Sequence, residues 1–278
     1  MPAEQSLRDG DLEQALAELQ ADVRKDPSNP KQRIFLFQLY ALLGQWDRAN
    51  TQLGVVAEMD ASALPMVQTY REALKCEALR RKVFTGERSP LVFGKPEPWV
   101  ALLLEAMRLS ATGKIADSQR LRADALEQAQ ATSGTIDEQA FAWIADADPR
   151  LGPVLEAIVN GRYYWIPFRR LRSVSIEKPT DLRDLVWAPV QLQFANGGET
   201  VAFVPTRYVG SEESSDPQVR MARRTDWVDR GDDLFEGIGL RMLATDQGEY
   251  PLLDTRQIRL DSPDEAPAAA GGSADIDG

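Results

Sequence analysis

The first sixty residues alternate between amphipathic runs and short polar breaks. From Leu7 to Arg24, apolar residues recur every three or four positions, a spacing that places them on one face of a helix. The run ends in Asp26-Pro27-Ser28-Asn29-Pro30, where prolines and small polar residues stop a helix. A second run covers Gln32–Leu43 and closes at Gly44, and a third begins near Trp46 and reaches Met59. The pattern therefore predicts three consecutive helices.

Two of these runs are related by a fixed spacing. Four pairs of like residues lie 34 positions apart: Gly10 and Gly44, Ala15 and Ala49, Leu19 and Leu53, Asp26 and Asp60. A period of 34 is typical of tetratricopeptide helix-turn-helix units, which stack into a curved surface that holds a peptide or a helix. The glycines suit the turn between helices, and the alanines let paired helices approach closely. A helical bundle without true repeats is the alternative interpretation.

A weaker third copy follows the helix expected at Trp99–Leu109. It starts at Gly113, and Ser118 takes the place of the small alanine. Another helix is expected at Met66–Val83, followed by a loop rich in glycine and proline from Gly86 to Pro98.

After Asp148 the pattern changes from helices to strands. A short apolar helix is expected at Leu151–Val159, ending at Asn160-Gly161. Alternating apolar residues then flank an Asn196-Gly197 turn, a strong signal for a β-hairpin. A second hairpin is expected around the turn Asp246-Gln247-Gly248.

The sequence thus predicts an α+β protein with two domains. Residues 1–148 form a helical, tetratricopeptide-like repeat domain, and residues 149–260 form a small, mostly antiparallel β domain with one short leading helix. Residues 261–278 are rich in Pro, Gly, Ala and Asp and lack large aromatics, so we expect a disordered tail.

Composition narrows the possible functions. The formal net charge of −11 over 278 residues disfavours general binding to nucleic acids or anionic membranes. The sequence has no apolar stretch of about 20 residues, as a membrane-spanning helix needs, and its N-terminus lacks the pattern of a signal peptide. Cys76 is the single cysteine, and its helical context predicts a buried small hydrophobe. We therefore expect a cytoplasmic protein.

The complete absence of histidine argues against many kinds of enzyme. It removes histidine-based acid/base catalysis, Ser-His-Asp and Cys-His nucleophiles, and histidine-ligated metals. No phosphate-binding or dinucleotide-binding glycine motif is present. We expect no catalytic residues, no cofactor and no metal.

Four aspartates carry the remaining enzymatic alternative. Asp146 and Asp148 could bind a metal, or cap the helix expected after Pro149. Asp181 and Asp184 fit a polar turn that leads into a strand. A carboxylate-based, metal-dependent enzyme would require all four side chains to converge in one pocket.

Aromatic residues supply the candidate contacts with a protein partner. The segment Arg162–Arg170 mixes arginines with aromatics; it fits either a core strand that buries Tyr164, Ile166 and Phe168, or a recognition surface. The candidate partner-binding residues are Phe35, Tyr40, Trp46, Tyr163, Tyr164 and Trp165. Each of them also fits a place in the core.

Long stretches of this sequence resemble the ImpE/TagJ family of type VI secretion accessory proteins. The resemblance rests on RLGPVLEAIVNGRYYWIPFRRL and DLRDLVWAPVQLQFANGGETVAFVPTRY, and on the opening LRDGDLEQALAELQADVRKDPSN with RIFLFQLYALLGQWDRA. It covers most of residues 7–210 and continues more loosely to about residue 260.

The resemblance implies a non-enzymatic cytoplasmic adaptor. Its partner would be the N-terminal helix of the small subunit (TssB-type) of the contractile sheath. The adaptor would modulate recycling of the sheath by a ClpV-type ATPase. The family offers no catalytic residues to carry over. A general tetratricopeptide adaptor with another protein partner is the alternative.

Overall fold

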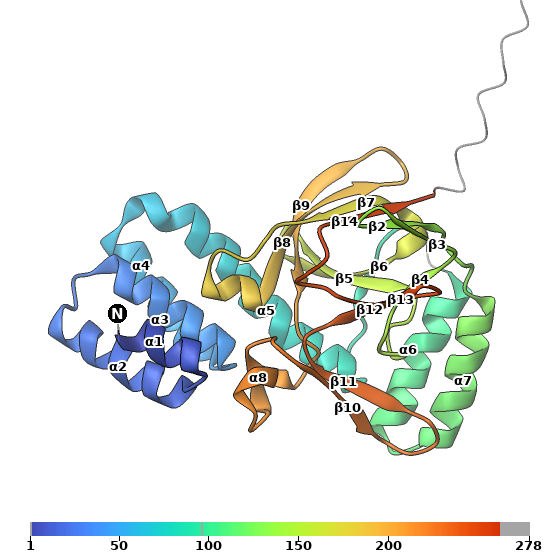
Figure 1. Ribbon diagram of the computed structural model, residues 1–278, viewed down its shortest axis with the longest axis horizontal. Helices are drawn as coiled ribbons and strands as arrows, with labels where there is room; N and C mark the ends of the chain where they lie inside the picture. Colours follow the sequence, from blue (N-terminus) through green and yellow to red (C-terminus); the bar gives the residue numbers. More distant parts are fainter. Residues whose placement is uncertain (1, 96, 262–278) are drawn as a thin grey trace, which may run out of the picture.

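A computed structural model describes residues 2–95 and 97–261. It has a helical end and a β-rich end, joined by one long helix (Figure 1). The helices are α1 (Pro2–Asp9), α2 (Leu12–Lys25), α3 (Pro30–Leu42), α4 (Trp46–Met59), α5 (Leu64–Phe84), α6 (Pro98–Ala111), α7 (Ile115–Gln128) and the short α8 (Pro217–Arg220). Single 3-10 turns occur at η1 (Ala61–Ala63), η2 (Phe168–Arg170), η3 (Leu182–Leu185) and η4 (Ser211–Glu213).

The 34-residue spacing corresponds to a repeated local structure. Gly10 and Gly44 lie in the turns α1–α2 and α3–α4 with φ of 84° and 67°, a conformation that favours glycine. Ala15 and Ala49 are fully buried where the paired helices meet. In the third copy Gly113 has φ 78°, and the buried Ser118 donates a hydrogen bond to the carbonyl oxygen of Ala106 at 2.6 Å. The hydroxyl is thus satisfied in a place where the other copies have a methyl group.

A nine-stranded sheet dominates the other end, with the order β1-β6-β5-β9-β8-β7-β14-β2-β3. Strand β1 pairs with β6 in parallel, and the other described pairs of this sheet are antiparallel. The strands are β1 (Leu91–Val92), β2 (Gly134–Ile136), β3 (Gln139–Phe141), β5 (Val154–Val159), β6 (Arg162–Pro167), β7 (Leu171–Ile176), β8 (Trp187–Phe194), β9 (Glu199–Pro205) and β14 (Gln257–Leu260).

Two smaller sheets complete the β-rich end. The first has the order β13-β12-β4 and the second pairs β10 with β11. Their strands are β4 (Ile144–Asp146), β10 (Thr225–Asp229), β11 (Phe235–Gly239), β12 (Met242–Thr245) and β13 (Gly248–Pro251). Both hairpins expected from the sequence are confirmed, as β8–β9 and β12–β13. The α+β fold class is confirmed as well.

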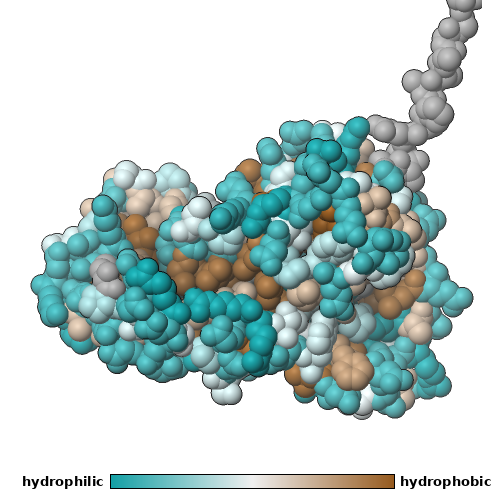
Figure 2. Space-filling model, in the orientation of Figure 1, coloured by the Kyte–Doolittle hydropathy of each residue, from teal (hydrophilic) through white to brown (hydrophobic). Residues whose placement is uncertain are grey.

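Two hydrophobic cores lie on opposite faces of the large sheet. One core joins the N-terminal helices and α5 to Ile158, Tyr163, Trp165 and Trp187. The other contains Ile166 and neighbours from the opposite face of the sheet. Because residues on both sides of Asp148 share the first core, the helical and β-rich parts are packed as one body. Turn η3 packs against α3, and Figure 2 shows apolar surface in the recess between the N-terminal helices and the sheet.

Two expectations about secondary structure were wrong. The predicted helix Leu151–Val159 is strand β5, which pairs with β6 and β9 and is buried at all six of its positions. Strands also appear before residue 148: β1 lies between α5 and α6, and β2, β3 and β4 follow α7. An apolar run that is buried on both faces has no period of its own, so the sequence did not distinguish helix from strand.

The predicted tail lies outside the described residues, apart from Asp261. Asp148 caps no helix. Its carboxylate instead accepts hydrogen bonds from the backbone and guanidinium of Arg150 in a buried turn. Cys76 is buried, as expected.

Candidate partner-binding groove

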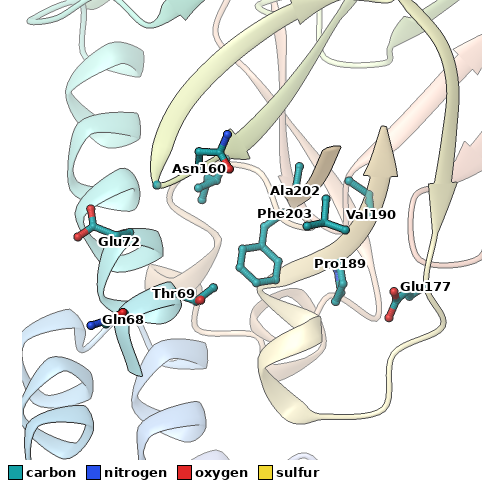
Figure 3. A pocket seen from close by; sticks show the side chains of 12 residues that line it. Gln68, Thr69, Glu72, Asn160, Glu177, Pro189, Val190, Ala202 and Phe203 are labelled. Carbon is teal, nitrogen blue, oxygen red and sulfur yellow. The ribbon is translucent and has the colours of Figure 1, made fainter. Parts of the chain in front are cut away.

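A groove of about 440 Å³ lies between helix α5, the end of strand β5 and the central parts of strands β8 and β9 (Figure 3). We call it the α5–β9 groove. It is lined by Gln68, Thr69, Glu72, Ile158, Asn160, Gly161, Glu177, Pro189, Val190, Val201, Ala202 and Phe203.

The groove exists because β5 and β9 separate. Strand β9 pairs with β8 along its whole length, but with β5 only through Ile158 and Phe203. Continuing that register by two residues would place Asn160 opposite Val201. Asn160 has already entered the β5–β6 turn with φ 48°, so this pair does not form. Strand β9 therefore continues beyond the end of β5 with one side uncovered.

The floor of the groove is apolar. Phe203 points into the gap between α5 and the strands (Figure 3), and its ring stacks on Tyr70 with centroids 5.3 Å apart. Val201 is 73% exposed, the highest value among the large hydrophobic residues described. Leaving such a side chain in water is unfavourable compared with covering it. This floor can accept an apolar side chain from another molecule.

The rim of the groove is polar and acidic. Gln68, Thr69 and Glu72 come from α5, and Glu177 follows β7. The lining includes these two glutamates and neither lysine nor arginine. Outside the lining, Lys75 pairs with Glu72 at 2.7 Å, but both side chains are largely exposed. Such a pair is weak and leaves Glu72 available to another cation.

Buried charges hold α5 against the sheet beside this groove. Arg80 of α5 donates to Glu156 of β5, with Nε and Oε1 2.7 Å apart, and Arg241 and the hydroxyl of Tyr163 also donate to Glu156. Burial alone would raise the pKa of Glu156, but the two arginines hold it at about 2. Glu156 therefore stays ionised at neutral pH. Nearby, Trp187 Nε1 donates to Glu77 at 2.9 Å, and burial raises the pKa of Glu77.

The cluster extends to Asp146 at the end of β4. Asp146 accepts hydrogen bonds from the hydroxyl of Tyr208 at 3.0 Å and from Arg241 at 3.2 Å. Burial raises its pKa to about 7, because the attraction of Arg241 offsets only part of the desolvation. The cluster thus spans one helix and two sheets, and its partners are internal. Its geometry indicates a role in positioning α5.

The four aspartates of the enzymatic hypothesis do not converge. Asp146 and Asp148 belong to the buried cluster, where they pair with Arg241 and Arg150. Asp181 and Asp184 instead form the capping box that opens η3. Among the described residues, no group of three or more Asp, Glu or Cys side chains has the geometry of a metal site. The polar turn expected at Asp181–Asp184 is confirmed.

The aromatic residues proposed as partner contacts do not gather on one surface. Tyr163 and Trp165 are buried against α5, and Tyr40 is buried in the helical end, where its hydroxyl accepts from Gln20. Phe35, Trp46 and Tyr164 are half-buried. The role of these six residues in binding stays a prediction.

The strand Arg162–Pro167 is buried on both faces, which changes the expected pattern. Ile166 and Phe168 lie inside as expected, but Tyr163 and Trp165 are buried too, because α5 covers their face. Tyr164, expected inside, is only half-buried, and its ring meets the edge of Phe93.

Trp46 also lines a second pocket of about 400 Å³, beside Glu77, Ala78 and Glu212. Its ring lies 6.2 Å from that of Trp187. Trp46 therefore packs against the interior on one side and lines this pocket on another.

Sequence reasoning missed the groove. Val201 and Phe203 belong to the alternating apolar run that follows the Asn196-Gly197 turn, and no pattern in the sequence distinguishes Glu177. The available signal was that both apolar residues fall on one face of β9, with Val201 close to the Asn196-Gly197 turn, where strands leave the body of a sheet.

Comparison with known proteins gives the family. The family model described as "ImpE protein" matches residues 138–259. The protein named "Type VI secretion system accessory component TagJ" from Pseudomonas aeruginosa is 53% identical over 264 residues, which are 95% of this chain and 92% of that protein. This chain belongs to the ImpE/TagJ family.

The fold of this family member is also found in a solved structure. The X-ray crystal structure of protein VPA1032 from Vibrio parahaemolyticus aligns with a TM-score of 0.86, covering 94% of this chain and 98% of the other. At 22% identity this likeness shows the fold alone. Within residues 2–95 and 97–261, the helices are too short or too polar to cross a membrane.

Proposed function

We propose that this ImpE/TagJ protein is a cytoplasmic, non-enzymatic accessory component of a type VI secretion system. It binds the N-terminal helix of the sheath small subunit (TssB-type) and modulates recycling of the sheath by a ClpV-type ATPase. Support for the system comes from the 53% identity to the Pseudomonas protein named as such a component. Support for helix binding comes from the α5–β9 groove.

The shape of the groove suits a helix. One wall is helix α5 and the floor is the face of β8 and β9, so a second helix can lie on the sheet beside α5. An amphipathic helix binds such a groove by placing its apolar stripe on an apolar floor. The observation that carries the proposal is the 73% exposed Val201 beside Phe203 on this floor.

The test is a calorimetric titration of the full chain with a peptide of the sheath small subunit's N-terminal helix. Val201→Asp places a carboxylate on the apolar floor. We expect affinity to fall at least about tenfold, since burying a valine contributes about 1.5 kcal/mol and tenfold corresponds to about 1.4 kcal/mol. Leu126→Asp on α7 is the matched control, because Leu126 is also exposed and lies outside the groove.

Saturable binding that Val201→Asp weakens and Leu126→Asp preserves would support the proposal. If the unmodified chain does not bind the peptide, the sheath-helix proposal is wrong. A general adaptor with another protein partner would then be the better explanation. Modulation of recycling is tested separately, by comparing the rate of ATPase-driven sheath disassembly with and without the protein.

A further inference from the structure

The α5–β9 groove carries charge as well as apolar surface, and the charge has one sign. Glu72 and Glu177 lie on opposite sides of Phe203 and Pro189 in Figure 3. A helix lying on that floor would therefore have one carboxylate along each flank. Its apolar stripe would face Val201 and Phe203, and the residues beside the stripe would face the glutamates.

Both glutamates are available to an incoming cation. Among the described residues, Glu72 has only the exposed Lys75 as its ion partner. Glu177 is exposed and forms no ion pair within residues 2–95 and 97–261; its backbone N–H donates to the carbonyl oxygen of Pro189. Two acidic flanks repel a helix that carries glutamates beside its stripe. They attract one that carries lysine or arginine there, and the net charge of −11 adds a long-range attraction of the same sign.

We propose that the α5–β9 groove selects a cationic amphipathic helix, one whose apolar stripe is flanked on both sides by lysine or arginine. This inference rests on the proposed function, since it specifies the chemistry of the helix that the groove takes. Val201 and Phe203 supply contact area, while Glu72 and Glu177 determine which amphipathic helices are accepted.

The experiment uses two synthetic helical peptides of about 18 residues. They share one leucine stripe and carry either lysine or glutamate beside it. The unmodified full chain is titrated with each peptide and with the sheath helix at low and high salt. We expect the lysine peptide to bind about tenfold tighter than the glutamate peptide at low salt, with a smaller preference at high salt, because exposed ion pairs are screened.

Two charge-reversed variants test whether the groove glutamates cause the preference for the lysine peptide. Glu72→Lys with Glu177→Lys should abolish or reverse it. Glu127→Lys with Glu249→Lys makes the same change in net charge at exposed positions outside the groove and should preserve most of it. All four positions are at least partly exposed, and circular dichroism checks that both variants fold.

The outcomes separate this inference from the proposed function. If the sheath helix binds but the unmodified chain does not distinguish the two peptides, charge selection is wrong and helix binding stands. If the control variant loses the preference as fully as the groove variant, the overall field explains it and the inference is also wrong. If neither the sheath helix nor either peptide binds, both the inference and the proposed function fail.

Discussion

Replacing Glu156 with glutamine should be among the most destabilising single changes in this protein. Glu156 is fully buried and accepts hydrogen bonds from Arg80, Arg241 and Tyr163. The amide of glutamine keeps the size of the side chain but removes its charge. Both guanidinium groups, which are also buried, would then have lost their shared counter-ion.

The size of the effect follows from the desolvation of those arginines. Removing one partner of a buried ion pair costs about 3–5 kcal/mol, because an uncompensated charge is left inside. Arg241 keeps Asp146 and Arg80 keeps Glu77 as second partners, which limits the loss. We therefore expect the free energy of unfolding to fall by about 3 kcal/mol.

Urea denaturation, monitored by fluorescence, measures this loss. The variant and the unmodified chain should have the same m-value, which checks that only stability has changed. Glu213→Gln is the control, because Glu213 pairs with Arg81 at the surface and should contribute no more than about 0.5 kcal/mol. A loss below about 1 kcal/mol for Glu156→Gln would contradict the view that this cluster fastens α5 to the sheet.

Three further predictions concern other buried groups. Burial raises the folded-state pKa of Asp146 to about 7, so the stability that its protonated form contributes is full below about pH 4 and is lost as the pH rises through 7. Relative to the unmodified chain, Asp146→Asn should therefore become more stable as the pH rises from 5 to 8. The same difference in urea midpoint between the two proteins at pH 5 and at pH 8 would refute this. Gly237→Ala should lower the free energy of unfolding by about 1–3 kcal/mol, because the new Cβ would lie 2.4 Å from the buried ring of Tyr208. A lower Tm measures this loss, and an unchanged Tm would show that the ring moves freely. Burial raises the pKa of the Cys76 thiol to about 12, so a thiol reagent at pH 8 should react only after unfolding, and rapid labelling of the native protein would contradict its buried position.

The sequence predicted those parts of the fold that depend on local chemistry. Gly10 and Gly44 marked turns because these turns need a positive φ, which glycine adopts at little cost. Asn196-Gly197 marked the β8–β9 hairpin because that dipeptide suits a tight turn. In each case the residue type suits the backbone conformation that the turn at that position needs.

Features that depend on packing between distant segments were missed. Strand β5 reads VLEAIV, and its lone glutamate could have signalled a buried charge. Its guanidinium partners, Arg80 and Arg241, lie 76 positions earlier and 85 positions later in the chain. The α5–β9 groove arises where two strands part, and Val201 looks like any other strand residue in the sequence. The domain boundary at Asp148 was drawn from the change of sequence pattern and stays a prediction; the first core includes residues from both sides of it.

Photo-crosslinking tests the central claim most directly. A sheath-helix peptide carrying a photoreactive residue on its apolar stripe is irradiated with the full chain, and the linked positions are mapped by mass spectrometry. The proposal predicts links to the walls and floor of the α5–β9 groove, at 68–72, 158–161 and 201–203. Links confined to other surfaces, such as the recess where η3 meets α3, would show that the helix binds elsewhere.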